Sequence, residues 1–326
     1  MLRIPTVLTA DELIDKAFRK AAKVNVIGAR SKIDMIKQKN IAKVSSVKDS
    51  IYSTLTGYVK AFPSFDNVPP FYHDIIDLLL GLDDLKKSLG AIDWCAHQVD
   101  KVANQSRSNI KRTRIPKDMD AYREEMYGRA ASLVKQIGKD LLFLNKARNK
   151  MRQLPTIDPE MPTIVVAGAP NVGKSQLVAA ISTANPKVAS YPFTTKDITV
   201  GLLIVKGVRY QVIDTPGLLD RPLEDRNEIE QQAIIALRHL ANLVVFVLDP
   251  TGTCGYPFDY QLSLLEGIKK LYPDAKMIVI ENKADLLKEK GERLQVSALT
   301  KSGVDELVQI IKKNLPENSE HNLFSR

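Results

Sequence analysis

Apolar residues in the first 155 positions recur three to four places apart, the spacing of one helix face, and they seldom alternate as they would in a strand. Thr9 followed by Glu12 is typical of a capped helix start, and prolines mark later helix ends. The expected helices cover residues 10–26, 31–62, 71–89, 91–115 and 118–153. Gly128 and Gly138 can weaken or kink the last one. This pattern predicts an all-α helical bundle domain over residues 1–155.

The pattern changes after residues 156–162, a proline-rich segment that we interpret as a linker. Short apolar runs now alternate with helical segments. Strands are expected at 163–167, 202–205, 210–213, 243–248, 277–280 and 293–296, and helices at 175–182, 229–240, 257–271 and 303–315. The alternation predicts an α/β domain over residues 163–315, with a mostly parallel sheet covered by helices on both faces. The polar tail, residues 316–326, is expected to be loose.

A glycine loop links the first expected strand to the helix behind it, with the spacing Gly-x-x-x-x-Gly-Lys-Ser of a P-loop. The loop consists of Gly168, Ala169, Pro170, Asn171, Val172, Gly173, Lys174 and Ser175. Backbone N–H groups of such a loop surround phosphates, and the helix start adds positive potential. We therefore expect Lys174 to contact the β- and γ-phosphates of a nucleotide and Ser175 to bind Mg²⁺. A glycine-rich turn without a ligand is the alternative that this motif alone leaves open.

Two further segments fit loops that respond to the γ-phosphate. One consists of Asp214, Thr215, Pro216 and Gly217, directly after an apolar strand. Asp214 can hold Mg²⁺ through water, and the Gly217 N–H can reach the γ-phosphate. Between this segment and the glycine loop lie Thr194 and Thr195, one of which would complete the Mg²⁺ shell. Thr195 is preferred, Thr194 is the second choice, and two loop threonines without this role are the alternative. Lys174, Thr195 and Gly217 are thus the candidate catalytic residues.

A fourth segment selects the base. The candidate residues are Asn282, Lys283 and Asp285, together with Ser297, Ala298 and Leu299 after the last expected strand. The Asp285 carboxylate can accept hydrogen bonds from the ring N–H and the exocyclic amine of guanine, whereas adenine presents an acceptor and no amine there. The stem of Lys283 can cover the base, and Asn282 can tie this loop to the glycine loop. The alanine N–H of the later loop can meet the guanine oxygen, although the interval after Asp285 is short. These residues predict GTP rather than ATP.

Two neighbouring positions modify this interpretation. Ras-type switches carry, after the glycine of this motif, a glutamine that orients the attacking water. Leu218 stands there and cannot polarise water, so we expect slow intrinsic hydrolysis unless another residue, a cation or a partner supplies the missing group. Asn171 is placed where it can help to hold K⁺ against the phosphates, and a simple turn residue is the alternative.

Charge divides the chain in the same way as the hydrophobic pattern. The first 155 residues carry 28 Lys and Arg against 17 Asp and Glu, a surplus of 11, so the whole net charge of +9 comes from this half. The asymmetry favours a polyanionic partner for the helical domain, with ordinary solvated helix faces as the alternative. The chain shows no apolar run of membrane-spanning length, no signal peptide and only two cysteines. We expect a cytoplasmic protein with no membrane partner.

The chain resembles the Obg-related translation-factor GTPases and, within them, the nucleolar GTP-binding protein family in a short archaeal form. The resemblance rests on residues 154–159, 168–175, 191–196, 214–222 and 254–255, and on the helical domain ahead of the switch domain. It implies a GTPase that helps to mature the large ribosomal subunit, with the helical domain on ribosomal RNA. In the Obg-type pattern the second threonine of the pair is the Mg²⁺ ligand, which supports Thr195.

The expected function is that of a nucleotide-gated assembly factor. GTP would be hydrolysed to GDP and phosphate, and the nucleotide state would control binding to a precursor of the large ribosomal subunit. A monomer is expected away from the ribosome. Two alternatives stay open: an RNA-binding assembly clamp with a mainly structural nucleotide pocket, and a signalling GTPase whose helical domain binds a protein partner.

Overall fold

The computed structural model describes residues 4–26, 29, 31–154, 157–189, 191, 197–287 and 291–315. Contacts along the backbone divide the chain into two compact units. A helical unit comprises Met1–Asp66 and Leu80–Arg152, and an α/β unit comprises Asn67–Leu79 and Gln153–Arg326. The division differs from the predicted domains mainly at Asn67–Leu79, a segment from the first half of the chain that groups with the α/β unit.

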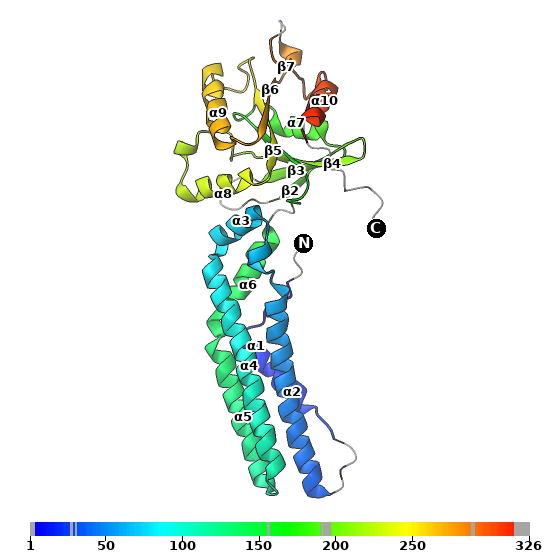
Figure 1. Cartoon of the computed structure of the whole chain (residues 1–326), viewed down its shortest axis with the longest axis vertical. Coiled ribbons are helices and arrows are strands. Elements are labelled where there is room, and N and C mark those ends of the chain that lie inside the picture. Colours follow the sequence, from blue (N-terminus) through cyan, green and yellow to red (C-terminus); the bar gives the residue numbers. More distant parts are fainter. Residues whose placement is uncertain are drawn as a thin grey trace. The chain divides into compact units, whose positions relative to one another are not determined.

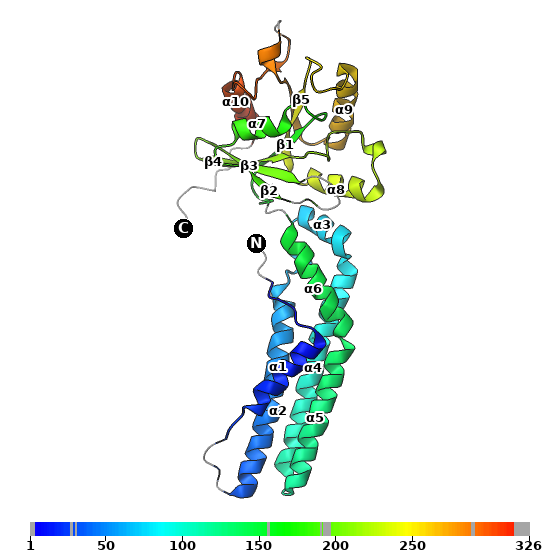
Figure 2. The ribbon, with the colours of Figure 1, turned by 180° about the vertical axis from the view of Figure 1, so that it is seen from behind.

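Helices of the first unit pack along one another through apolar faces (Figures 1 and 2). They are α1 (Ala10–Ala22), α2 (Lys32–Ala61), α4 (Leu82–Arg112), α5 (Pro116–Gln136) and α6 (Gly138–Gln153). The expected capping box opens α1: the Thr9 N–H donates to the Glu12 carboxylate at 2.8 Å, and the Glu12 N–H donates to the Thr9 hydroxyl at 3.3 Å. On α2, Val44, Val47 and Ile51 are fully buried at helical spacing. The predicted all-α bundle is confirmed.

One helix break lies at a position other than that predicted, and a second lies at Gly138, where the sequence indicated a weakened helix. Gly81, with a φ of +71°, separates α3 (Pro70–Leu80) from α4, because glycine adopts this left-handed conformation without strain. The break predicted around Gly90 is wrong, since that residue lies inside α4. The helix predicted over 118–153 is interrupted at Ile137, just before Gly138, and is therefore two helices.

Helix α3 packs in the α/β unit. Phe71 and Ile75 belong to the core of that unit and are 1% and 0% exposed. The Tyr72 hydroxyl donates to the Ile157 carbonyl oxygen at 2.6 Å. The Phe71 ring stacks on Tyr191, with the ring centroids 6.5 Å apart. A helix that precedes much of the helical unit in sequence thus completes the core of the α/β unit.

The α/β unit is built on a seven-stranded sheet with the order β2-β3-β4-β1-β5-β6-β7. Its strands are β1 (Thr163–Ala167), β2 (Lys187–Ala189), β3 (Ile198–Val205), β4 (Val208–Asp214), β5 (Ala241–Leu248), β6 (Lys276–Glu281) and β7 (Leu294–Gln295). β3 runs antiparallel to β2 and β4, and the other neighbours are parallel. Every residue of β1 is buried, as expected of a strand covered on both faces.

Helices α7 (Lys174–Ile181) and α10 (Val304–Asn314) lie together on one side of this sheet, and α8 (Glu228–Arg238) and α9 (Phe258–Leu271) on the other (Figures 1 and 2). The predicted fold class, a helical bundle followed by a mostly parallel α/β domain, is confirmed. The short edge strand β2 has no counterpart in the prediction, because three residues give too little periodicity to indicate a strand. No helix in the described ranges is both long and apolar enough to cross a membrane.

Truncation of Phe71 tests the position of α3. Phe71→Ala leaves a cavity in the α/β core, so we expect that unit to lose about 3–5 kcal/mol of stability. Hydrogen exchange measured by mass spectrometry should accelerate in β1, β4 and β5 and stay unchanged in α4 and α5. Ile33→Ala, at a side chain that is 48% exposed on α2, is the control. Acceleration confined to the helical unit would contradict the assignment.

Candidate functional site

Four loops that carry most of the predicted residues meet at one edge of the sheet. They follow β1, β4, β5 and β6, which run in the same direction. Since the carboxyl ends of parallel strands lie on one edge, the topology brings these loops together. Because the predicted motifs lie at the ends of these strands, they form one site.

The glycine loop between β1 and α7 uses backbone conformations that suit its residue types. Gly168 has a φ of +143° and Gly173 a φ of +98°, both unfavourable for residues with a side chain. A Cβ atom on Gly173 would collide with the Asn282 side chain. Asn171, with a φ of +61°, donates from its side chain to the Cys254 carbonyl oxygen at 3.5 Å. The structure thus gives Asn171 a link to a neighbouring loop, and its proposed part in K⁺ binding stays a prediction.

A cavity of about 380 Å³ lies against this loop. Its lining residues are Pro170, Asn171, Gly173, Lys174, Ser175, Gln176, Pro216 and Asp220. Lys174 is only 6% exposed, and its Nζ donates to the carbonyl oxygens of Gly168 and Ala169, each at 2.8 Å. A concave, polar space bordered by a lysine and by the start of a helix is suited to phosphate groups.

Ser175 and Asp214 meet beside the same cavity. The Ser175 hydroxyl donates to Oδ2 of Asp214, and Oδ1 is buried with no hydrogen-bond partner among the described residues. Burial raises the pKa of Asp214, and the Ser175 hydrogen bond and the Lys174 charge oppose that rise. A buried carboxylate oxygen without a partner, next to a serine hydroxyl, fits Mg²⁺ with Ser175 as a direct ligand and Asp214 bound through water.

The loop after β4 is held by a small polar cluster around Gly217. The Gly217 N–H donates to Asp220 Oδ2 at 2.9 Å, and the Gly217 carbonyl oxygen accepts from Arg226 Nη1 at 2.6 Å. Arg226 also donates to Asp220 Oδ1 at 3.0 Å. Leu218, which stands at the position of the water-orienting glutamine, is 1% exposed and packs in the core. Sequence reasoning did not identify Arg226, because nothing local marks it as a partner of Gly217.

Asn282 joins the glycine loop to the base-selecting loops. This side chain is 1% exposed, and its Nδ2 donates to the Val172 carbonyl oxygen at 2.8 Å while its Oδ1 accepts the Ala298 N–H at 3.0 Å. The Ser297 hydroxyl donates to Asp285 Oδ1 at 2.5 Å. The short interval after Asp285 is therefore sufficient to bring both predicted loops together.

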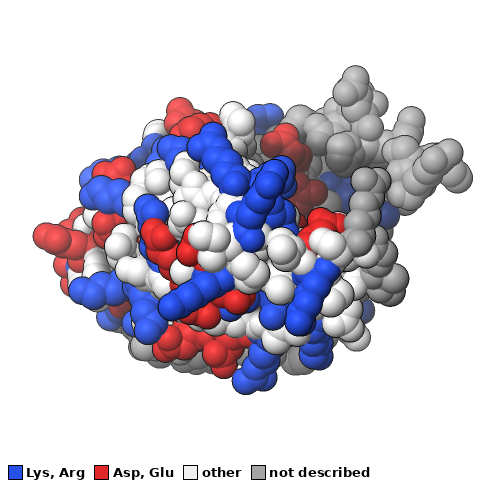
Figure 3. All heavy atoms as spheres, turned by 90° about the horizontal axis from the view of Figure 1, so that it is seen from below, with Lys and Arg blue, Asp and Glu red and all other residues white. Residues whose placement is uncertain are grey.

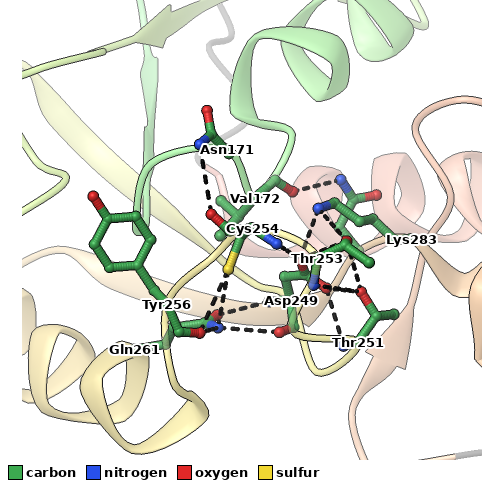
Figure 4. A network of polar contacts seen from close by, with 10 residues as sticks. Asn171, Val172, Asp249, Thr251, Thr253, Cys254, Tyr256, Gln261 and Lys283 are labelled. Carbon is green, nitrogen blue, oxygen red and sulfur yellow. Dashed lines mark hydrogen bonds and ion pairs between the residues drawn. The ribbon is translucent and has the colours of Figure 1, made fainter.

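Asp249, at the end of β5, organises a network that sequence reasoning missed (Figure 4). Its buried carboxylate accepts hydrogen bonds from Lys283 Nζ at 2.7 Å and from the backbone N–H groups of Thr251 at 3.0 Å and Cys254 at 2.8 Å. Burial alone would raise the pKa of Asp249, but the hydrogen bonds from Lys283 and Thr251 hold this pKa below its usual value. The network fixes the Lys283 ammonium group. An aspartate directly after an apolar strand was the only sequence signal.

Four predicted residues have no observed contact to the site: two lie outside the described residues, and two lie within them. Thr194 and Thr195 lie outside the described residues, so the role of either in Mg²⁺ binding stays a prediction. The Thr215 hydroxyl is buried and donates to the Val166 carbonyl oxygen at 3.2 Å, which is a structural contact to β1. Leu299 is 74% exposed.

Comparison with known proteins assigns the chain to a family. A family model described as the NOG1 N-terminal helical domain matches residues 2–158, and one described as nucleolar GTP-binding protein 1 (NOG1) matches residues 228–285. An uncharacterised protein of Methanocaldococcus jannaschii is 40% identical over 290 residues, which are 88% of this chain and 81% of that protein. The chain belongs to the NOG1 family.

Named members of the NOG1 family are longer. Nucleolar GTP-binding protein 1 of Drosophila melanogaster is 37% identical over 277 residues, which are 85% of this chain and 42% of that protein. The chain thus spans less than half of that relative. A crystal structure described as nucleolar GTP-binding protein 1 of Plasmodium falciparum is 33% identical and covers 49% of this chain and 89% of that chain, with a TM-score of 0.45. Both the family model for residues 228–285 and the Drosophila melanogaster relative are described as GTP-binding.

Exchange of Asp285 tests how this site selects its base. In Asp285→Asn one carboxylate oxygen becomes an amide donor, so we expect GTP affinity to fall on the order of a hundredfold and XTP, whose base offers an oxygen there, to bind better than GTP. Competition against a fluorescent guanine nucleotide measures both affinities. Asp305→Asn, at an exposed residue of α10, is the control. Unchanged preference for GTP would refute the role of Asp285.

Proposed function

We propose that this NOG1-family protein hydrolyses GTP to GDP and phosphate and acts in the cytoplasm as a nucleotide-gated assembly factor for the large ribosomal subunit. The observation that carries the proposal is the convergence, at one sheet edge, of the phosphate cavity, the Ser175–Asp214 pair and the loops tied by Asn282. Together they offer groups for phosphate, Mg²⁺ and guanine. The relatives in Drosophila melanogaster and Arabidopsis thaliana are both named nucleolar GTP-binding protein 1, which supports the GTP-binding part of the proposal.

Recognition of GTP would use residues of the phosphate cavity and of the loops that follow β4, β5 and β6. Lys174 would exchange its two carbonyl contacts for contacts to the β- and γ-phosphates, a gain because an ammonium group bonds an anionic oxygen more strongly than a neutral one. Mg²⁺, when bound at Ser175 and Asp214, would neutralise part of the phosphate charge. Asp285 would accept the two guanine N–H donors, with Lys283 held in place by Asp249.

Hydrolysis by the isolated protein would be slow. The residue after Gly217 in this chain, Leu218, is buried in the core and offers no polar group to an attacking water. K⁺ near Asn171, Thr195 or a partner would have to supply the orienting group. Such dependence suits an assembly factor whose turnover is linked to its partner.

The helical unit offers a basic end for an RNA partner. Lys37 Nζ donates to the Lys111 carbonyl oxygen at 2.9 Å, which places the start of α2 beside the end of α4. Exposed basic residues follow where α4 passes into α5, namely Lys111, Arg112, Arg114 and Lys117. Figure 3 views this end and shows Lys and Arg interspersed with Asp and Glu around an uncharged centre. Contacts of such residues to phosphate would be salt-sensitive and independent of base sequence.

Retention on ribosomal particles tests the gating. The amount of protein that co-sediments with large-subunit precursors should differ by about fivefold or more between a non-hydrolysable GTP analogue and GDP. Coupling between two binding sites commonly changes affinity by that factor. Equal retention with GTP analogue, GDP and no nucleotide would refute gating.

Measurement of phosphate release distinguishes a GTP-hydrolysing enzyme from the alternative, an RNA-binding clamp whose nucleotide pocket is structural. Several turnovers per molecule, faster with ribosomal RNA or in K⁺ than in Na⁺, support hydrolysis as part of the function. The absence of turnover under all of these conditions would favour the clamp.

Neutralising the basic end tests the RNA partner. Changing Lys111, Arg112, Arg114 and Lys117 to Gln should weaken binding to ribosomal RNA and make the slope of log affinity against log salt shallower by about 2 to 4, since every basic side chain that pairs with a phosphate releases roughly one counterion. Filter binding over a salt series measures the slope. The matched control changes four exposed lysines of the α/β unit to Gln, namely Lys269, Lys270, Lys276 and Lys313. A flat salt dependence in the unaltered protein would favour the signalling alternative, in which a protein occupies the helical unit.

A further inference from the structure

One ion pair holds both backbone polar groups of Gly217, the N–H of the peptide group before it and the carbonyl of the peptide group after it. Asp220 accepts the Gly217 N–H at 2.9 Å, and Arg226 donates to the Gly217 carbonyl oxygen at 2.6 Å. The carboxylate and the guanidinium also bond one another at 3.0 Å. Gly217 has a φ of +78°, a backbone conformation that other residues rarely adopt. Asp220 therefore fixes the direction of the Gly217 N–H, and Arg226 fixes the adjoining carbonyl group.

The pair is buried, yet it borders the phosphate cavity. The side chains of Arg226 and Asp220 are 1% and 9% exposed. Asp220 lines the cavity together with Pro216 and with the loop that carries Lys174 and Ser175. Removing two charges from water is costly, so a buried ion pair by itself is weak evidence of stabilisation. The position of the ion pair beside the cavity indicates instead that it influences ligand binding there.

A carboxylate that accepts a backbone N–H and pairs with a guanidinium makes the same kinds of contact as a phosphate oxygen. Under the proposed function, on which this inference rests, the Gly217 N–H is the group that meets the γ-phosphate. One N–H group makes one good hydrogen bond, so Asp220 and the γ-phosphate cannot both have it. Their negative charges also repel one another across the cavity.

We propose that Asp220 is an internal competitor of the γ-phosphate and thereby sets the preference of the site between GTP and GDP. GTP must displace the Asp220 carboxylate from the Gly217 N–H, whereas GDP leaves the bond intact. Arg226 keeps its bond to the Gly217 carbonyl oxygen and holds the displaced carboxylate close, so the exchange is reversible after hydrolysis. Asp220 in this account is a specificity-determining residue and takes no part in the chemical step.

The test compares affinities for GDP and for a non-hydrolysable GTP analogue, measured by competition against a fluorescent guanine nucleotide. Asp220→Asn removes the charge and keeps the shape, and charge-assisted hydrogen bonds are about twice as strong as neutral ones. We expect affinity for the GTP analogue to rise about tenfold and affinity for GDP to change less than about twofold. Asp225→Asn, which removes a neighbouring exposed carboxylate from the same loop, should leave both affinities unchanged.

A second variant is needed because Asp220→Asn leaves Arg226 as a buried cation without an anionic partner, which can destabilise the fold. Changing Asp220 to Asn together with Arg226 to Gln neutralises both members of the pair, and the same rise for the GTP analogue is expected. Equal changes for both nucleotides, or none, would overturn the proposal.

The chemical step provides a further check. Phosphate release that falls in Asp220→Asn with an unchanged ratio of affinities would identify Asp220 as a water-orienting group and would also overturn it. The proposed function is tested separately, by the preference of the unaltered protein for GTP and GDP over ATP and ADP. Loss of that preference refutes both proposals, whereas an unchanged ratio in a guanine-specific protein refutes only this one.

Discussion

The buried side-chain amide of Asn282 is the contact on which the rest of the nucleotide site depends. It has one donor and one acceptor engaged, and both bonds reach backbone groups, the Val172 carbonyl and the Ala298 N–H. Bonds to backbone set the position of a whole loop and not only of one side chain. In a buried environment, removal of one partner leaves an unsatisfied polar group, which typically costs about 1–3 kcal/mol. The lack of a side chain at Gly173 has the same origin, since the Asn282 amide occupies that space.

Three cationic side chains of the site are paired within the protein. Lys174 bonds backbone carbonyl groups, Lys283 bonds Asp249, and Arg226 bonds Asp220. A ligand that binds any of these three cations therefore replaces an existing contact, whereas the buried Asp214 Oδ1 is still without a partner among the described residues. Net affinity then depends on the difference between two sets of contacts, which makes small changes in either set effective.

The motifs at strand ends could be predicted from sequence because each is local: the loop residues follow an apolar strand within a few positions, and parallel strands end at one edge. The strands expected at 202–205 and 210–213 and the all-α first half were also predictable, because periodicity is a local property of the sequence. Asp249 and Arg226 were not. Asp249 bonds Lys283, which follows a different strand, and Arg226 bonds Gly217 nine residues earlier in an irregular loop, where no periodic spacing indicates the contact. Helix α3 was recognised as a helix, but its apolar face does not say which core it enters.

The path of the chain through α3 has a consequence for synthesis on the ribosome. Phe71 and Ile75 emerge well before β1, the first strand of the core that receives them. Until those strands emerge, the apolar face of α3 has no partner in the α/β unit, while the helices that follow it can already assemble as a bundle. The second core can close only when most of the chain has been made, which is a non-local and hence slow step. During much of its translation, the nascent protein thus exposes an apolar helix face of the kind that chaperones bind.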